Sequence, residues 1–135
     1  MGNGGQMLVA SDWWLVNPSP QPNQGRLMKS HKELNVWKDA TDLAENIYQL
    51  TSKYPKVEMF WISSQLRRAA VSIPSNIAEG SARGSRKEYI RFLYIAAGSA
   101  SELETQLELS IRTTMGERSK IVKLQEKTTI ILKML

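Results

Sequence analysis

The chain has 135 residues, no cysteine, one histidine and a formal net charge of +5. This length suits a single domain with a modest hydrophobic core. Disulfides and zinc–thiolate sites are excluded without cysteine, and no apolar run approaches the roughly 20 residues of a membrane-spanning helix. The positive charge favours a polyanionic partner, although many basic proteins merely carry a solvated surface. We expect a cytoplasmic protein with no membrane association.

Residues 1–28 differ in composition from the rest of the chain. They contain the pair Trp13–Trp14 and three prolines between Pro18 and Pro22. Proline disfavours a helix because it lacks the amide donor and clashes with the preceding turn. We predict a disordered or extended extension over residues 1–28 and a folded domain over residues 29–135. One hypothesis is that Met28 is the natural start; the alternative is that the two tryptophans anchor a partner.

The first helix is predicted from Ser30 to Tyr54, where Pro55 ends it. Ser30 and Glu33 form the S-x-x-E pattern of a capping box. Apolar residues recur at spacings of three, four and seven and form a wide stripe: Val36, Trp37, Ala40, Leu43, Ala44, Ile47 and Leu50.

The second helix is predicted from about Lys56 to Glu79. Its apolar stripe contains Met59, Leu66, Ala70, Ile73 and Ile77, and Phe60 and Trp61 widen it near the start. Pro74 predicts a kink, since it removes the hydrogen bond to the carbonyl of Ala70. The polar residues Ser72, Ser75 and Asn76 lie around this break and are suited to bind freed backbone groups. Gly80 is predicted to stop the helix.

Two more helices follow. Ser85 and Glu88 form a second capping box, which opens a helix that ends near Thr114. Its six consecutive small residues, 96–101, predict the tightest helix crossing of the fold. The last helix spans roughly Glu117 to Leu135. Short loops between helices favour antiparallel neighbours, so we predict an all-α, up-down-up-down four-helix bundle.

Motifs for enzymatic chemistry are missing from the sequence. A di-iron site in a bundle needs paired Glu-x-x-His motifs, but His31 is the sole histidine and lies at the start of the first helix. No nucleophile elbow, P-loop or dinucleotide fingerprint occurs. We expect neither metal nor cofactor and no catalytic residue. An enzyme would require Arg68, Asn76 and Glu79 to converge in a cleft.

Basic residues concentrate between positions 67 and 91, with six bases against two acids. We predict that the six contact nucleic-acid phosphates: Arg67, Arg68, Arg83, Arg86, Lys87 and Arg91. The alternative is a solvated end of the bundle. Arg68 has a structural alternative of its own, which is an ion pair with Glu79 or with an acid of another subunit.

The wide apolar stripe and the small residues of the third helix indicate more apolar surface than one bundle of this size covers. A closed homo-oligomeric ring would bury the excess and repeat the basic residues around an axis. The alternative is a monomer with a generous core.

Three segments carry a resemblance to a known family: LNVWKDATDLAENIY, SQLRRAAVSIPSNIAEGSARGS and KEYIRFLYIAAGSASELETQLELS. The sequence resembles the bacterial four-helix-bundle proteins related to 23S rRNA intervening-sequence proteins. It is also similar to the accessory variability determinant proteins of diversity-generating retroelements, basic pentamers that work with a reverse transcriptase. The resemblance implies a homopentameric ring without established enzymatic activity. It singles out Arg67 and Arg68, and it implies structural roles for Gln65, Ser72, Pro74, Asn76, Glu79 and Gly80.

From these features we expect a non-enzymatic, homo-oligomeric protein that binds RNA or DNA through a basic surface. The alternative is a protein-interaction scaffold or an accessory subunit for a nucleic-acid enzyme such as a reverse transcriptase. The last helix ends sooner than is usual in relatives, which affects any interface that its end would make.

Overall fold

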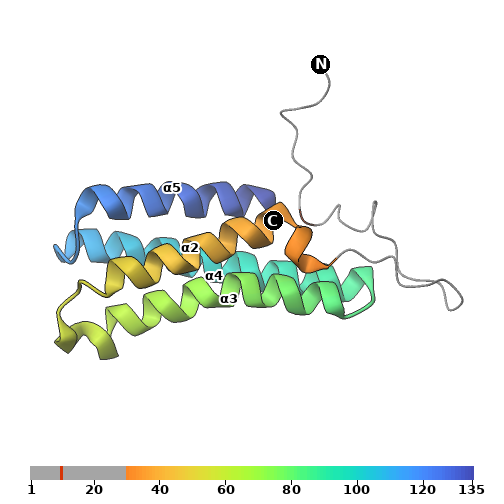
Figure 1. The fold of residues 1–135 in the computed structure, drawn as a ribbon, viewed down its shortest axis with the longest axis horizontal. Coiled ribbons are helices and arrows are strands. Elements are labelled where there is room, and N and C mark those ends of the chain that lie inside the picture. The colour runs from red at the N-terminus through yellow and green to blue at the C-terminus, as the bar shows by residue number, and fades with distance from the viewer. Residues whose placement is uncertain (1–9, 11–29) are drawn as a thin grey trace, which may run out of the picture.

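Four α-helices make up most of the part of the chain that the computed structural model describes, namely residue 10 and residues 30–135. They are α2 (Asn35–Thr51), α3 (Ile62–Ala82), α4 (Arg86–Arg112) and α5 (Arg118–Met134), with two short 3-10 helices, η2 (His31–Glu33) and η3 (Lys56–Phe60). Successive α-helices run in opposite directions (Figure 1). Both α2 and α4 pack against α3 and against α5. The predicted all-α, four-helix bundle is confirmed, and the described residues contain no strand.

The core follows the predicted three-and-four spacing. Each helix contributes side chains that are fully buried between the four helices, among them Leu43, Ile47, Leu66, Ile73, Ile77, Leu103, Leu107, Ile121 and Ile131. Burial of one such side chain contributes about 1.5–3 kcal/mol. Ala10 is also buried with this core. The other residues of the predicted extension 1–28 lie outside the described part of the chain.

The first helix starts later than the capping pattern predicts. The Ser30 hydroxyl accepts a hydrogen bond from the Lys32 amide at 3.2 Å, so it caps the 3-10 turn η2 and not α2. Leu34 is extended and separates the two helices while its side chain packs against the core. Burial of Leu34 therefore coincides with the break, and the prediction of one helix from Ser30 was wrong.

The second helix is also shorter than predicted. Residues 56–60 form η3, and Trp61, with φ −119° and ψ −105°, separates it from α3. As a result Phe60 and Trp61 are 88% and 68% exposed. They do not widen the core stripe as predicted, because η3 turns them away from the bundle.

Pro74 lies inside α3, which continues to Ala82. Close to it, the Asn76 amide donates to the Ser72 carbonyl at 2.7 Å and to the Ser72 hydroxyl at 2.9 Å. The Ser72 hydroxyl also bonds the Ser99 hydroxyl of α4 at 2.8 Å. Ser72 therefore contacts Asn76 within α3 and Ser99 across to α4.

Gly80 is not the end of α3. A Cβ at this position would lie 2.7 Å from the Phe92 Cβ of α4, so the glycine allows a close approach of the two helices. A Cβ at Gly98, within the stretch predicted as the tightest crossing, would meet nothing within 4 Å. Gly80 therefore marks a close approach of α3 and α4 near their connection, whereas Gly98 is exposed and its neighbours Ala96 and Ala100 are fully buried. No helix in the described ranges is long and apolar enough to span a membrane.

Candidate nucleic-acid interface

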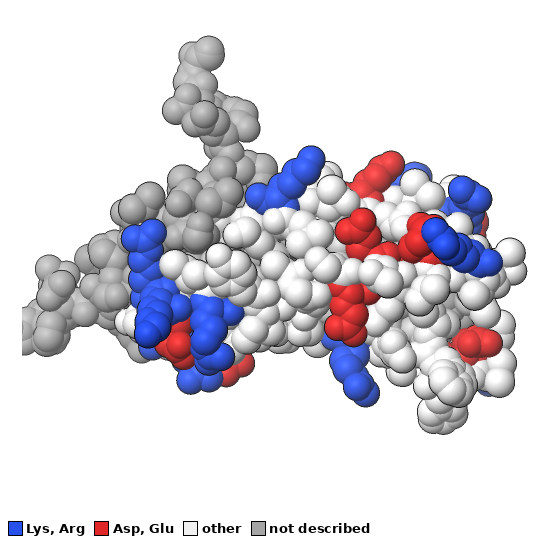
Figure 2. All heavy atoms as spheres, turned by 180° about the vertical axis from the view of Figure 1, so that it is seen from behind, with Lys and Arg blue, Asp and Glu red and all other residues white. Residues whose placement is uncertain are grey.

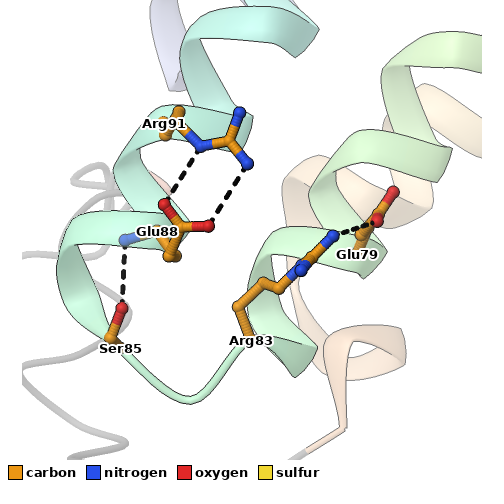
Figure 3. A network of polar contacts seen from close by, with 5 residues as sticks. All are labelled: Glu79, Arg83, Ser85, Glu88 and Arg91. Atoms are coloured by element: carbon orange, nitrogen blue, oxygen red, sulfur yellow. Dashed lines mark hydrogen bonds and ion pairs between the residues drawn. The ribbon is translucent and has the colours of Figure 1, made fainter.

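Four of the six predicted phosphate-binding residues lie in or close to the α3–α4 loop, residues 83–85. Gly84 makes the turn with a φ of +79°, a conformation that favours glycine. Ser85 then caps α4, since its hydroxyl accepts a hydrogen bond from the Glu88 amide at 3.1 Å, as the second capping pattern predicts (Figure 3). This turn places Arg83 at the end of α3 and Arg86 and Lys87 in the first turn of α4. We call Arg83, Arg86, Lys87 and Arg91 the basic loop.

Ion pairs divide the basic loop into two kinds of cation. Arg83 pairs with Glu79 at 2.6 Å, and Arg91 makes two hydrogen bonds to the Glu88 carboxylate at 3.0 and 3.2 Å (Figure 3). The Arg91 hydrogen bond lowers the pKa of Glu88, and the same contact raises the pKa of Arg91. Arg86 and Lys87 are exposed and make no ion pair with any residue in the described ranges.

Phe92 supports the two paired arginines. The guanidinium carbons of Arg83 and Arg91 lie 4.9 and 4.5 Å from its ring centroid, within the range of cation–π attraction. The ring itself is buried beside Gly80. Arg83 from α3 and Arg91 from α4 therefore share one aromatic platform, which holds their charges together at this end of the bundle.

Arg67 and Arg68 lie elsewhere. They precede Arg83 by about 15 residues on the same helix, which corresponds to roughly 22 Å along the axis. Arg67 donates to the Thr51 hydroxyl of α2 at 2.8 Å and lies over the Tyr48 ring at 4.7 Å, so it ties α3 to α2. Arg68 is exposed. The six predicted residues thus do not form one continuous surface.

The space-filling view agrees with this separation. On the visible face, a group of Lys and Arg side chains gathers at one end, further basic side chains lie at the opposite end, and acidic side chains lie mainly over the middle and that opposite end (Figure 2). The alternative of an Arg68–Glu79 pair within one chain is wrong, because the two are about 16 Å apart along α3 and Glu79 pairs with Arg83.

Arg68, Asn76 and Glu79 do not converge in one cleft. Asn76 is bonded to Ser72, Glu79 is paired with Arg83, and Arg68 lies toward the other end of α3. Within the described part of the chain, no group of three or more His, Asp or Glu residues is placed to hold a metal ion. Gln65 of α3 accepts a hydrogen bond from Gln106 of α4 at 3.4 Å.

Sequence reasoning did not identify a second basic region. Lys53 at the end of α2 and Lys120, Lys123 and Lys127 of α5 line one groove. The only sequence signal is the spacing of the three α5 lysines at three and four residues, which places them on one helix face. Lys53 joins them only because α2 and α5 are antiparallel neighbours.

The fold and the loop together define an all-α bundle protein with a basic end. Residues 32–135 match the family described as 23S rRNA-intervening sequence protein, and the chain belongs to this family. A solved structure is similar as well: a protein of unknown function from the S23 ribosomal protein family of Bacteroides thetaiotaomicron VPI-5482, with 32% sequence identity and a TM-score of 0.65. The match covers 73% of this chain and 92% of that one. Comparison with curated proteins gives no match.

Proposed function

We propose that this protein is non-enzymatic and binds RNA or DNA phosphates through the basic loop. The observation that carries the proposal is the exposed pair Arg86 and Lys87, which have no ion pair among the described residues. Two such cations at a helix start can neutralise phosphates and release their counterions. The family name, which refers to a ribosomal RNA insertion, supports a nucleic-acid partner.

Arg83 and Arg91 have a supporting role in this proposal. Their carboxylate partners are exposed, and exposed ion pairs contribute only about 0–1 kcal/mol. An approaching phosphate can therefore compete for either guanidinium at little cost. Such contacts fix position on a strand and do not read its sequence, so we expect similar affinity for different sequences.

The test is the salt dependence of binding to fluorescent single-stranded RNA and double-stranded DNA. The variant Arg86→Glu/Lys87→Glu removes two phosphate contacts, so the slope of log K against log salt should fall by about 1.4 for a single strand and about 1.8 for a duplex. Lys38→Glu/Lys133→Glu is the matched control, since these two exposed lysines lie outside the basic loop. Binding that does not respond to salt, or an equal effect of both variants, would contradict the proposal.

We further propose that the protein is a homo-oligomer, and that its exposed aromatic face lies between subunits. This face comprises Tyr48, Val57, Phe60, Trp61 and Val71, all exposed in the single chain. On α4 three further apolar side chains are exposed: Tyr94 and Ile95 are adjacent, and Leu109 lies about 20 Å further along the helix. Two different apolar surfaces on one chain suit a head-to-tail contact, which closes into a ring. Five copies is the number that the family resemblance implies.

Light scattering tests the assembly. The wild-type chain should give the mass of a ring, and Phe60→Ser/Trp61→Ser should give a smaller species with unchanged helical circular dichroism, since neither side chain contributes to the core. A wild-type monomer at micromolar concentration would refute the ring.

The same aromatic face supports a second candidate function, a scaffold or accessory subunit for a nucleic-acid enzyme such as a reverse transcriptase. In that case Phe60 and Trp61 contact a different protein. A partner that stays bound to the immobilised protein after nuclease treatment, and is lost with Phe60→Ser/Trp61→Ser, would favour this function over direct nucleic-acid binding.

A further inference from the structure

The groove between α2 and α5 lies at the opposite end of the bundle from the basic loop. It has a volume of about 610 Å³, and Lys53, Lys120, Lys123 and Lys127 line it. We call these four residues the lysine groove. Its volume lies within the range of about 300–1,000 Å³ that is usual for small-molecule sites.

Charge in the groove is strongly one-sided. Glu117 is the acidic residue that lines it, which leaves four positive charges against one negative. Glu117 pairs with Lys120 at 3.4 Å. Its pKa is lowered by a hydrogen bond from Ser119, by Lys120 and by Lys53, so the Lys53 charge acts on it from the end of α2.

The other lysines of the groove remain available. Asp39 and Asp42 of α2 line an adjoining hollow together with Lys127, yet no carboxylate in the described ranges comes within ion-pair distance of Lys53, Lys123 or Lys127. Three ammonium groups without an ion pair to any described residue therefore border one cavity. Such an arrangement is electrostatically unfavourable unless an anion or solvent occupies the space between them.

The lining is compatible with a phosphate group. Every basic residue of the groove is lysine, and lysine binds phosphate as a point charge with three rotatable donors. Lys120, Lys123 and Lys127 are spaced along α5 at about 4.5 and 6 Å. Leu50 and Leu124 provide apolar surface, and Asn46 and Gln49 provide amides beside the charges. These groups suit an organic body attached to the phosphate.

We propose that the lysine groove binds a phosphate ester of a nucleoside, with the phosphates on the lysines and the organic part against Leu50, Leu124 and the two amides. The same chemistry is presented by a free nucleotide and by the backbone of a nucleic-acid strand. This site is independent of the basic loop, and either can exist without the other.

The experiment compares two fluorescent probes, an N-methylanthraniloyl derivative of ADP and a short labelled single-stranded RNA. Each is titrated against the wild-type chain, Lys123→Glu/Lys127→Glu, the control Lys38→Glu/Lys133→Glu and the basic-loop variant Arg86→Glu/Lys87→Glu. Circular dichroism confirms that each variant is folded, which is expected because all of these side chains are exposed.

The groove variant should weaken ADP-probe binding by at least about tenfold, since one lost charge-assisted hydrogen bond is worth roughly that factor. The control and the basic-loop variant should leave it unchanged. If the groove variant weakens only RNA binding, the proposal also holds, and the phosphate ester in the groove is then the backbone of a nucleic-acid strand. The proposal is overturned if neither probe binds the wild-type chain, or if the groove variant binds both probes as the control does.

Discussion

Gly80 and Gly98 are both helical glycines, yet the structure predicts opposite effects of alanine at the two positions. In Gly80→Ala the new methyl group would lie 2.7 Å from the Phe92 Cβ and 3.3 Å from the Tyr89 carbonyl oxygen. Neither atom is the free end of a flexible side chain, so α3 and α4 must separate. In Gly98→Ala the methyl group meets nothing within 4 Å.

The expected magnitudes follow from two opposing terms. Replacing a helical glycine by alanine stabilises a helix by about 0.8–1 kcal/mol. Overpacking a tight contact typically costs about 1–3 kcal/mol, and at Gly80 the fixed neighbouring atoms favour the upper half of that range. We therefore expect Gly80→Ala to lower the free energy of unfolding by about 1–2 kcal/mol, and Gly98→Ala to raise it by up to about 1 kcal/mol.

Urea denaturation followed by circular dichroism measures both changes. With an m-value of about 1–3 kcal/mol/M, the midpoint should fall for Gly80→Ala and rise for Gly98→Ala by several tenths of a molar unit or more. All chains are compared at one concentration, because association adds to apparent stability. A Gly80→Ala chain as stable as the wild type would show that α3 and α4 are not as close as described.

Three further predictions concern the other end of α3, the α4–α5 turn and the loop. Gly116→Ala should destabilise the chain by about 1–3 kcal/mol in the same urea assay, because Gly116 has a φ of +80° and a Cβ there would lie 2.6 Å from the Tyr54 ring; an unchanged midpoint would contradict this. Arg67→Ala should cost about 1–2 kcal/mol through the lost hydrogen bond to Thr51, and a melting temperature equal to that of the wild type would refute this structural role. Arg91 holds the pKa of Glu88 in the folded chain below its usual value of 4.5. The ionised Glu88 therefore stabilises the fold above about pH 4.5, and this stabilisation is lost as the pH falls through the pKa of the folded chain. Melting temperatures should fall on acidification below pH 4.5, and they should fall less steeply in Glu88→Gln.

The four α-helices could be predicted because apolar residues, which the structure buries, recur every three or four positions along each of them. Leu43 and Ile47, or Leu103 and Leu107, are four residues apart and fully buried, as a helix with one face in a core requires. The Ser85 cap was also predictable, because a cap depends only on residues within one turn. Local rules failed at Ser30, where the extended residue Leu34, which packs against the core, separates the capped turn from α2.

Other features depend on partners distant in sequence. Glycine near a helix end is typical of a stop, and only the contact with Phe92 shows that Gly80 permits a close crossing. Phe60 and Trp61 read as core residues because aromatic residues are usually well buried, but η3 exposes them. The separation of Arg67 from Arg83, by contrast, follows from the rise of 1.5 Å per residue within a single helix.

The basic residues differ in whether they have partners within the described part of the chain. Arg67 is bound to Thr51, and Arg83 and Arg91 are paired and stacked on Phe92. Arg86 and Lys87 at one end of the bundle, and Lys123 and Lys127 toward the other, have no ion pair among the described residues. Helix lengths place these two pairs more than about 20 Å apart, whereas the Debye length at physiological salt is about 8 Å. The charges of the two basic regions are therefore screened from each other. Charge reversal in one region should leave unchanged the slope of log K against log salt for a probe that binds at the other.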